Sequence, residues 1–396
     1  MTQDAVQAQY EAYPYPERKP SDERKRLITG SPSLPVEMDH WLWGGERDWS
    51  QPLRALVAGG GTGDALIQLA QRLTDAGRPY DITYLDMSVA ARGIAEKRAK
   101  VRKLDRITFV TGSLLDAGDY GLFDYIDCCG VLHHLENPQA GFDALAGALA
   151  PDGGMGIMVY APHGRSGVYP LQAAFGTLFQ GLAPEKRLKQ AKRIFAALPD
   201  AHPFKRNTRL VDHEQGDAGF YDLLLHGRDR PFTITEVLAA LEVAGLDYAG
   251  SPEPMLYDPT PLMGQLPAAM DRVERMQLAE DLRGTFKTHV IYARKSGQVV
   301  APPLGQKDAV PHLRGVAPEA LAAHVAETGQ ITIDTAGEAF TFDVPRAAAG
   351  AIALVDGRRD LEQIGRGQDG FAPLWAQVEA ALCGSGMMHY SCILAV

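Results

Sequence analysis

A glycine-rich turn between a predicted strand and a predicted helix is the segment of this chain with the clearest chemical potential. The apolar run at 53–58 ends in GGGTG at 59–63, and apolar residues with helical spacing begin directly after it. Glycines allow the backbone to approach a ligand closely, and the first turn of a helix offers unpaired N–H groups and a positive dipole. The turn therefore predicts a cofactor site, although dinucleotide-binding dehydrogenases use a similar turn.

The spacing of the glycines and an acid on the next strand bear on the kind of cofactor. Glycines at 59, 61 and 63 give the pattern G-x-G-x-G, whereas a dinucleotide site usually shows G-x-G-x-x-G. The second predicted strand ends at Asp86, which follows Gly63 by 23 residues. A carboxylate at this place can accept hydrogen bonds from both hydroxyls of a ribose. Asp86 is therefore compatible with a site for a nucleoside or for a dinucleotide and does not distinguish between the two.

Two adjacent histidines, His133 and His134, follow the fourth predicted strand. Neighbouring residues on a helix do not share a face, and no Cys or His lies nearby at ligand spacing, so we predict no metal site. Because a neutral imidazole can accept a proton near pH 7, either histidine is a candidate general base. A structural role for both is the alternative.

The loop after the fifth predicted strand carries side chains that suit a reaction site, since such loops bind ligands in open α/β sheets. We expect Tyr160 to act with the histidines in catalysis, and Arg165 to hold a carboxylate or phosphate. The stretch 221–230 would approach from the other side. The predicted substrate residues are His163, Arg165, Tyr169, Tyr221 and His226. A solvated loop is the alternative.

The elements that must position these residues alternate between strands and helices. Apolar runs typical of strands lie at 53–60, 81–88, 107–113, 123–130, 155–161, 246–254 and 288–296. Segments with helical spacing separate most of them. This alternation predicts an α/β fold with a doubly wound, parallel, seven-stranded, Rossmann-like sheet and right-handed crossovers.

Changes in pattern divide the chain further. Residues 1–50 are rich in Tyr, Trp and Pro and are expected to form an ordered N-terminal arm over the cofactor pocket. The alternating region spans 51–297, and a helical, locally basic stretch at 165–227 interrupts it as a predicted cap insertion. Residues 306–396 are expected to form a small C-terminal accessory domain, α+β and similar to a winged helix.

At its motifs the sequence resembles the class I S-adenosylmethionine-dependent methyltransferases. The matching strings are LVAGGGTGDALIQLA at 56–70, ITYLDMS at 82–88, ITFVTGSLLD at 107–116, FDYIDCCGVLHHL at 123–135 and LAPDGG at 149–154. The last two are common in small-molecule methyltransferases similar to those of quinone biosynthesis. The resemblance implies S-adenosyl-L-methionine as cofactor and S-adenosyl-L-homocysteine as product.

The resemblance also assigns roles by position. Asp86 would hold the ribose diol. The implied cofactor residues are Tyr15, Gly59, Gly60, Gly61, Gly63, Asp86, Met87, Gly112, Ser113, Leu114, Cys129 and Gly130. Two positions depart from the family, which usually has an acid where this chain has Val57 and an Asp where it has Ser113. We expect Val57 to leave the cofactor's ammonium group, or its bound water, without the usual acidic partner.

The leader QYEAYPYPERKP at 9–20 resembles that of some bacterial methyltransferases, including protein-lysine methyltransferases with regulatory domains. In many enzymes of the class, an N-terminal Tyr lies over the cofactor. The residues expected to close the pocket mouth are Tyr10, Tyr13, Tyr15, His40, Trp41, Trp43 and Gly44. Packing of these rings on the domain surface is the alternative.

Composition and charge exclude several function classes. A net charge of −10 disfavours a general binder of nucleic acid or of anionic membranes. Four cysteines are too few for a disulfide framework, so we expect a reducing, cytoplasmic location. The first residues lack the features of a signal peptide, and no run approaches the roughly 18 apolar residues of a membrane span.

Three hypotheses for the function remain open. The one we favour is in-line transfer to a small molecule held under the cap insertion. The others are transfer to a protein side chain such as lysine, and a non-catalytic regulator that only binds the cofactor. The C-terminal domain is expected to serve dimerisation or substrate recruitment, and its deletion to spare cofactor binding.

Overall fold

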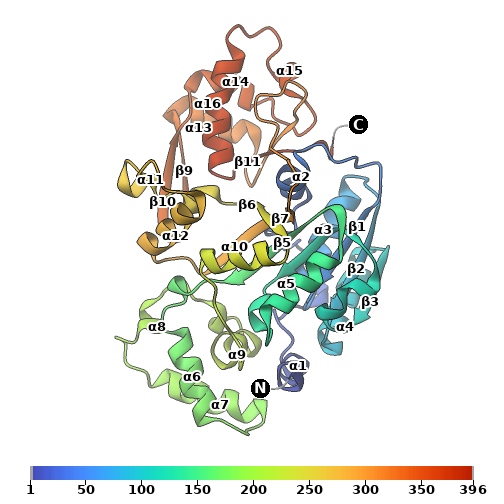
Figure 1. The fold of residues 1–396 in the computed structure, drawn as a ribbon, viewed down its shortest axis with the longest axis vertical. Coiled ribbons are helices and arrows are strands. Elements are labelled where there is room, and N and C mark those ends of the chain that lie inside the picture. The colour runs from blue at the N-terminus through green and yellow to red at the C-terminus, as the bar shows by residue number, and fades with distance from the viewer. Residues whose placement is uncertain (1–2, 395–396) are drawn as a thin grey trace.

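A seven-stranded sheet forms the centre of the computed structural model, which describes residues 3–394 (Figure 1). The strands are β1 Leu53–Ala58, β2 Tyr80–Asp86, β3 Ile107–Thr111, β4 Phe123–Cys129, β5 Leu149–Tyr160, β6 Leu246–Gly250 and β7 Thr288–Lys295. They lie in the order β3-β2-β1-β4-β5-β7-β6. Neighbours pair in parallel except β7, which runs antiparallel to β5 and β6. The predicted α/β fold with a seven-stranded sheet is confirmed.

Helices cover both faces of the sheet, because successive residues of a strand point to opposite sides. The helices around it are α2 Pro35–Trp43, α3 Asp64–Asp75, α4 Val89–Arg102, α5 Pro138–Gly147, α10 Ile234–Val243 and α12 Arg272–Arg283, while the residues of the short α11 Thr260–Met263 are all exposed. Val57 of β1 belongs to an apolar cluster with α2, α3 and α4. Its neighbour Leu56 belongs to another cluster with α5, α10 and α12. The sheet is therefore wound on both sides.

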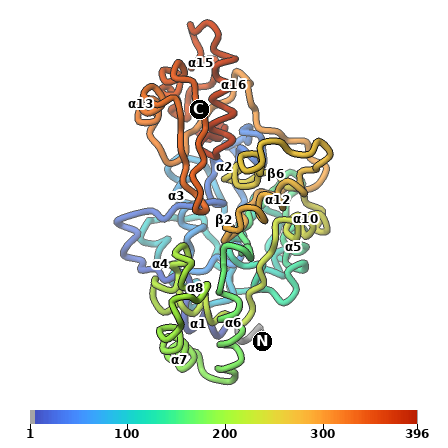
Figure 2. Tube along the Cα trace, turned by 90° about the vertical axis from the view of Figure 1, so that its left-hand side faces the viewer, coloured from blue at the N-terminus to red at the C-terminus, as the bar shows by residue number. Residues whose placement is uncertain are grey.

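Four helices lie in the segment expected to be an insertion. They are α6 Val168–Leu178, α7 Pro184–Ala196, α8 Pro203–Arg206 and α9 Asp217–Leu225. Their own apolar cluster contains Phe175, Phe204 and Phe220. These helices lie at one end of the molecule together with α1 (Gln3–Ala12), as Figures 1 and 2 show.

The C-terminal elements lie at the opposite end (Figure 2). They are β8 Pro311–Leu313, α13 Pro318–Thr328, β9 Gln330–Thr335, β10 Glu338–Asp343, α14 Ala349–Ile352, α15 Leu361–Ile364, α16 Phe371–Gly384 and β11 Met388–Tyr390. They share an apolar core of their own around Trp375. Beyond β11, however, Ile393 joins the cluster beneath the central sheet. Along the described chain, the helices are all too short or too polar to cross a bilayer.

The aromatic segment at 40–44 contacts this C-terminal strand and not the cofactor pocket. The N–H of Tyr390 donates a hydrogen bond to Nδ1 of His40 at 3.0 Å, and the hydroxyl of Ser391 donates to Oδ2 of Asp39 at 2.7 Å. The prediction that residues 40–44 close the pocket mouth is therefore wrong. Their composition indicated packing, but the partner strand lies 350 residues away in the sequence and gave no local signal.

Candidate functional site

A cavity of about 830 Å³ opens at the carboxyl ends of β1, β2, β4 and β5, which is where open α/β sheets bind ligands. The predicted site residues that line it are Tyr15, Gly59, Gly60, Gly61, Asp86, Met87, Gly112, Ser113, Leu114, Cys129, Gly130, His134, Tyr160 and Arg165. The predicted site residues outside its lining are Gly63, His133, His163, Tyr169, Tyr221 and His226. One cavity thus joins the predicted cofactor and catalytic groups.

The glycine-rich turn after β1 forms the floor of this cavity. Gly59 and Gly61 have φ angles of 68° and 52°, which side chains rarely adopt. A Cβ on Gly59 would lie 2.4 Å from a methyl of Val131, and one on Gly61 would lie 2.8 Å from the carbonyl oxygen of Tyr15. Only glycine fits these two places, so the backbone itself faces the cavity.

Asp86 is held at the end of β2 by two backbone donors. Its Oδ2 accepts from the N–H of Gly61 and its Oδ1 from the N–H of Ser88, both at 2.8 Å. Burial raises the pKa of Asp86, and these hydrogen bonds act against that shift. A carboxylate has about four lone-pair sites, so two sites are left for the hydroxyls of a ribose. The turn and this acid fit a nucleoside.

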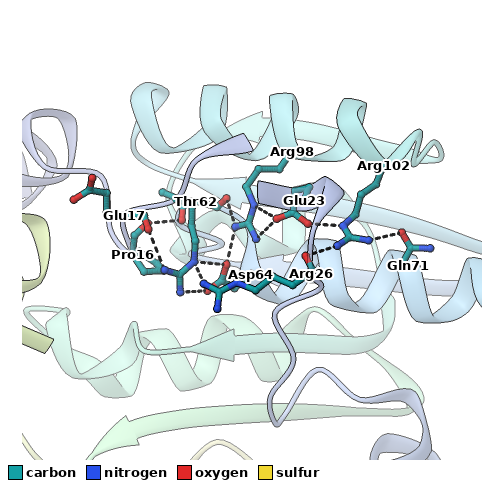
Figure 3. A network of polar contacts seen from close by, with 10 residues as sticks. Pro16, Glu17, Glu23, Arg26, Thr62, Asp64, Gln71, Arg98 and Arg102 are labelled. Atoms are coloured by element: carbon teal, nitrogen blue, oxygen red, sulfur yellow. Dashed lines mark hydrogen bonds and ion pairs between the residues drawn. The ribbon is translucent and has the colours of Figure 1, made fainter. Parts of the chain in front are cut away.

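The segment after α1 lines the cavity through Tyr15, Pro16 and Arg18. Ion pairs between side chains join this segment to α3 and α4 (Figure 3). Arg18 donates three hydrogen bonds to Asp64, the first residue of α3, at 2.7 to 3.1 Å. Arg98 of α4 lies between Asp64 and Glu23, 2.7 Å from each carboxylate. Tyr10 and Tyr15 line the cavity as predicted, whereas Tyr13 stacks on Tyr221 with ring centres 5.0 Å apart.

Replacing Arg98 with Met is expected to destabilise the protein by about 3 kcal/mol, because two carboxylates lose the guanidinium between them. The Arg98 side chain is 1% exposed. Arg102→Met is the matched control: Arg102 lies one turn away at 13% exposure and also pairs with Glu23, and because Arg98 would still pair with that carboxylate we expect a smaller loss than for Arg98→Met. Denaturant unfolding of the full chain measures both changes. Equal losses in the two variants would contradict the central role of Arg98.

A buried carboxylate, Asp222 of α9, lies in the cavity wall away from the glycine turn. It accepts hydrogen bonds from the hydroxyl of Tyr10 at 3.1 Å and from the hydroxyl of Tyr160 at 3.4 Å. Burial raises the pKa of Asp222, and the nearby His134 acts against that shift. Within residues 3–394 no Lys, Arg or His side chain forms an ion pair with it, since the nearby Arg165 pairs with Asp229 at 3.1 Å. The cavity therefore contains an unpaired negative charge.

The hydrogen-bond partners of two histidines fix where their protons lie. Nδ1 of His134 is 2.9 Å from the carbonyl oxygen of Arg228, which can only accept, so Nδ1 carries the proton and Nε2 keeps a lone pair. Nδ1 of His226 accepts from the N–H of Arg228 at 3.1 Å, so its proton is on Nε2, 3.3 Å from the Tyr10 hydroxyl. His134 is thus the ring that can take a proton in the cavity.

Sequence spacing showed no third ligand near the paired histidines, but the fold supplies one. His134, Asp222 and His226 each bring a ligand atom within 4.8 Å of the other two, and so do His133, His134 and Asp229. That part of the argument against a metal was therefore wrong. However, the proton on Nε2 of His226 leaves that ring no lone pair for a cation. The first group instead forms a hydrogen-bond chain from His226 through Tyr10 to Asp222.

Among the other predicted catalytic and substrate residues, Arg165 lines the cavity but its charge is already paired, and His133 and His163 lie outside the lining. The guanidinium of Arg165 lies 3.6 Å from the ring centre of Tyr160 and donates to the hydroxyl of Tyr169 at 3.0 Å. Because Asp229 already neutralises it, the expectation that Arg165 holds a substrate anion is not supported. His133 accepts from the backbone N–H of Tyr160 at 3.4 Å. His163 is exposed and lies 3.4 Å from Asp281.

Of two further acids of the site, the sequence analysis missed Asp127 and did not select Asp222 as a substrate residue. Asp222 lay inside the stretch expected to approach the site but was not singled out; its spacing of four from His226 was the available signal, because residues i and i+4 share a helix face. Asp127 of β4 also lines the cavity. It sits in an apolar strand, where a single acid gives no motif.

Comparison with known proteins agrees with the motifs. Residues 56–155 match the family model described as a methyltransferase domain. An uncharacterized protein of Synechococcus sp. is 31% identical over 292 residues, which are 69% of this chain. The match spans 65% of that relative's length.

Solved structures share the fold over nearly the whole chain. The structure of PKMT2 from Rickettsia typhi has a TM-score of 0.62 at 17% identity and covers 92% of this chain and 76% of that one. The same protein in complex with AdoHcy has a TM-score of 0.61, also at 17% identity, covering 92% and 77%. The likeness includes the C-terminal part, because the match covers more than the sheet and its helices.

Proposed function

Since the chain contains a class I methyltransferase domain, we propose that it transfers a methyl group from S-adenosylmethionine to an amine of a small molecule. The observation that carries the acceptor class is the unpaired, buried carboxylate of Asp222 between two tyrosine hydroxyls. A buried charge is costly unless an opposite charge pairs with it, and an ammonium group supplies that charge. Tyrosine rings beside a cation add to the attraction.

The methyl donor is supported by the other end of the cavity. S-adenosylmethionine, when bound, supplies an electrophilic methyl group on a sulfonium. Asp86 would accept hydrogen bonds from the two ribose hydroxyls, and the backbone at Gly59 and Gly61 would lie against the cofactor. Tyr10 and Tyr15 line the cavity, and we expect them to exclude water around the bound cofactor, which would strengthen electrostatic interactions there.

The chain's own groups can prepare an amine for attack. Asp222 binds the acceptor as an ammonium ion and orients it. Nε2 of His134 has the free lone pair that takes the proton, and the resulting imidazolium lies beside the Asp222 carboxylate. The neutral amine is then held in the cavity with its lone pair free. The proton later leaves His134 to solvent as the product departs.

The size of the acceptor is the second part of this proposal. Asp222 and His134 are 4% and 7% exposed, and the cavity of about 830 Å³ lies within the range of small-molecule sites. Such burial favours a small amine over a folded protein surface. A lysine side chain could enter only if a flexible segment carried it inside.

Label transfer from methyl-labelled S-adenosylmethionine to cell lysate tests this function. After incubation with the full chain and chromatographic removal of unreacted S-adenosylmethionine, which is itself a labelled cation, we expect a new labelled cation in the small-molecule fraction. Label in the protein fraction would instead support the lysine alternative. No transfer to either fraction would contradict an enzyme and favour a regulator that only binds the cofactor. Heat-treated protein serves as the background control.

A further inference from the structure

The ammonium group at the cofactor's amino-acid end would lack its usual acidic partner on β1, because this chain has Val57 where the family usually has an acid. The neighbouring strand, β4, has an acid, Asp127, at the position paired with Val57. β1 and β4 pair in parallel, with Val57 opposite Asp127 in the register. Residues paired in parallel strands point to the same face of the sheet, and both side chains line the cavity.

Asp127 is held in the cavity wall by Ser33, which lies just before α2, and by Tyr125 of its own strand. Its Oδ2 accepts from the hydroxyl of Ser33 at 2.6 Å and from the hydroxyl of Tyr125 at 3.4 Å. Its other oxygen, Oδ1, has no hydrogen-bond partner in the described part of the chain, yet the residue is only 1% exposed. No ion pair reaches it within residues 3–394. A carboxylate so buried lacks the cation that would offset its desolvation.

We propose that Asp127 binds the ammonium group of the methionine end of S-adenosylmethionine, in place of the acid that β1 lacks. The inference rests on the proposed function, because it assumes that this cofactor occupies the cavity. Ser33 holds one carboxylate oxygen and leaves Oδ1 for the ammonium. The family's acid lies on β1, whereas the acid proposed for this chain lies on the neighbouring strand β4, at the paired position.

Burial raises the pKa of Asp127 to about 6, and the hydrogen bonds from Ser33 and Tyr125 act against that shift. Burial without a cation makes this charge costly in the free protein, and binding an ammonium group would remove that cost. A purely structural Asp127, bonded only to Ser33, would not distinguish between ligands with and without that group. Comparing ligands with and without an ammonium group therefore distinguishes a binding role of Asp127 from a purely structural one.

Calorimetric titration with two ligands tests the proposal. S-adenosylhomocysteine carries the amino-acid end, and methylthioadenosine has the same nucleoside and a sulfur but no ammonium. Asp127→Asn keeps the shape and removes the charge. We expect it to weaken S-adenosylhomocysteine about 10- to 100-fold and to change methylthioadenosine less than about twofold.

The double variant Val57→Asp/Asp127→Asn returns the acid to β1. It is expected to bind S-adenosylhomocysteine to within about fivefold of the wild type, since the two positions lie side by side. Equal weakening of both ligands, or of neither, by Asp127→Asn would overturn the proposal, as would no recovery in the double variant. If the wild type binds neither ligand, the proposed function fails as well; if it binds both and only the variants disagree, this inference alone fails.

Discussion

Asp222→Asn is expected to lower the rate of methyl transfer about a thousandfold while S-adenosylhomocysteine binds with unchanged affinity. The amide keeps the shape of the side chain but can neither bind an ammonium group nor stabilise an imidazolium at His134, and groups in such roles contribute about 10² to 10⁴ in rate. Label transfer to the acceptor fraction measures the loss. A loss below tenfold would contradict the assigned role.

The matched control lies on the same helix. Asp217→Asn makes the same chemical change at the start of α9, where the side chain is 58% exposed and pairs with Lys192. Because exposed pairs contribute little, we expect activity within about twofold of the wild type. Equal losses in both variants would point to damage to α9 and not to chemistry at Asp222.

The pH dependence of the rate should also depend on the ionisation of Asp222. Burial raises the pKa of Asp222, and only the ionised carboxylate binds an ammonium ion. Activity at low acceptor concentration should therefore rise with pH as Asp222 loses its proton, at a pH above the ordinary range of an aspartate. Asp222→Asn should lack this acidic limb. A limb that persists in the variant would assign it to another group.

Asp86→Ala is expected to weaken S-adenosylhomocysteine at least 100-fold. Each hydrogen bond to a charged group is worth about 1.5–3 kcal/mol, and two ribose hydroxyls lose their acceptor together; each 1.4 kcal/mol is about tenfold. Calorimetry measures the affinity, and thermal unfolding checks that the turn stays folded without the acceptor for Gly61 and Ser88.

An exposed acid provides the control for Asp86. Asp116 follows the implied cofactor residues Ser113 and Leu114 in the sequence, is exposed and does not line the cavity. Asp116→Asn should leave the affinity within about twofold. Should Asp86→Ala bind within threefold of the wild type, the carboxylate would not hold the ribose.

The cofactor end could be predicted from the sequence because its parts are local. The glycine turn, Asp86 and the strand ends that follow it each lie within one strand-turn-helix unit, and the parallel sheet brings those units together at one edge. The family model over 56–155 confirms the methyltransferase domain. The alternation predicts a parallel sheet, which is wrong for β7, because β7 runs antiparallel to β5 and β6 and no local pattern gives the direction of a strand.

The acceptor end could not be predicted to the same degree, because its contacts join distant segments. Tyr10 and Asp222 are separated by 212 residues, and no local pattern fixes which face of α9 meets the leader. Arg165 could bind an anion by its residue type, but in the structure its guanidinium already forms an ion pair with Asp229. The register that puts Asp127 beside Val57 is likewise a property of the sheet.

Calorimetric titration of the full chain with S-adenosylhomocysteine and, in parallel, with NAD⁺ tests the central claim most directly. A nucleoside cradled by the glycine turn and held by Asp86 predicts one binding site for S-adenosylhomocysteine and no heat with NAD⁺. Binding of NAD⁺ without binding of S-adenosylhomocysteine would contradict the account.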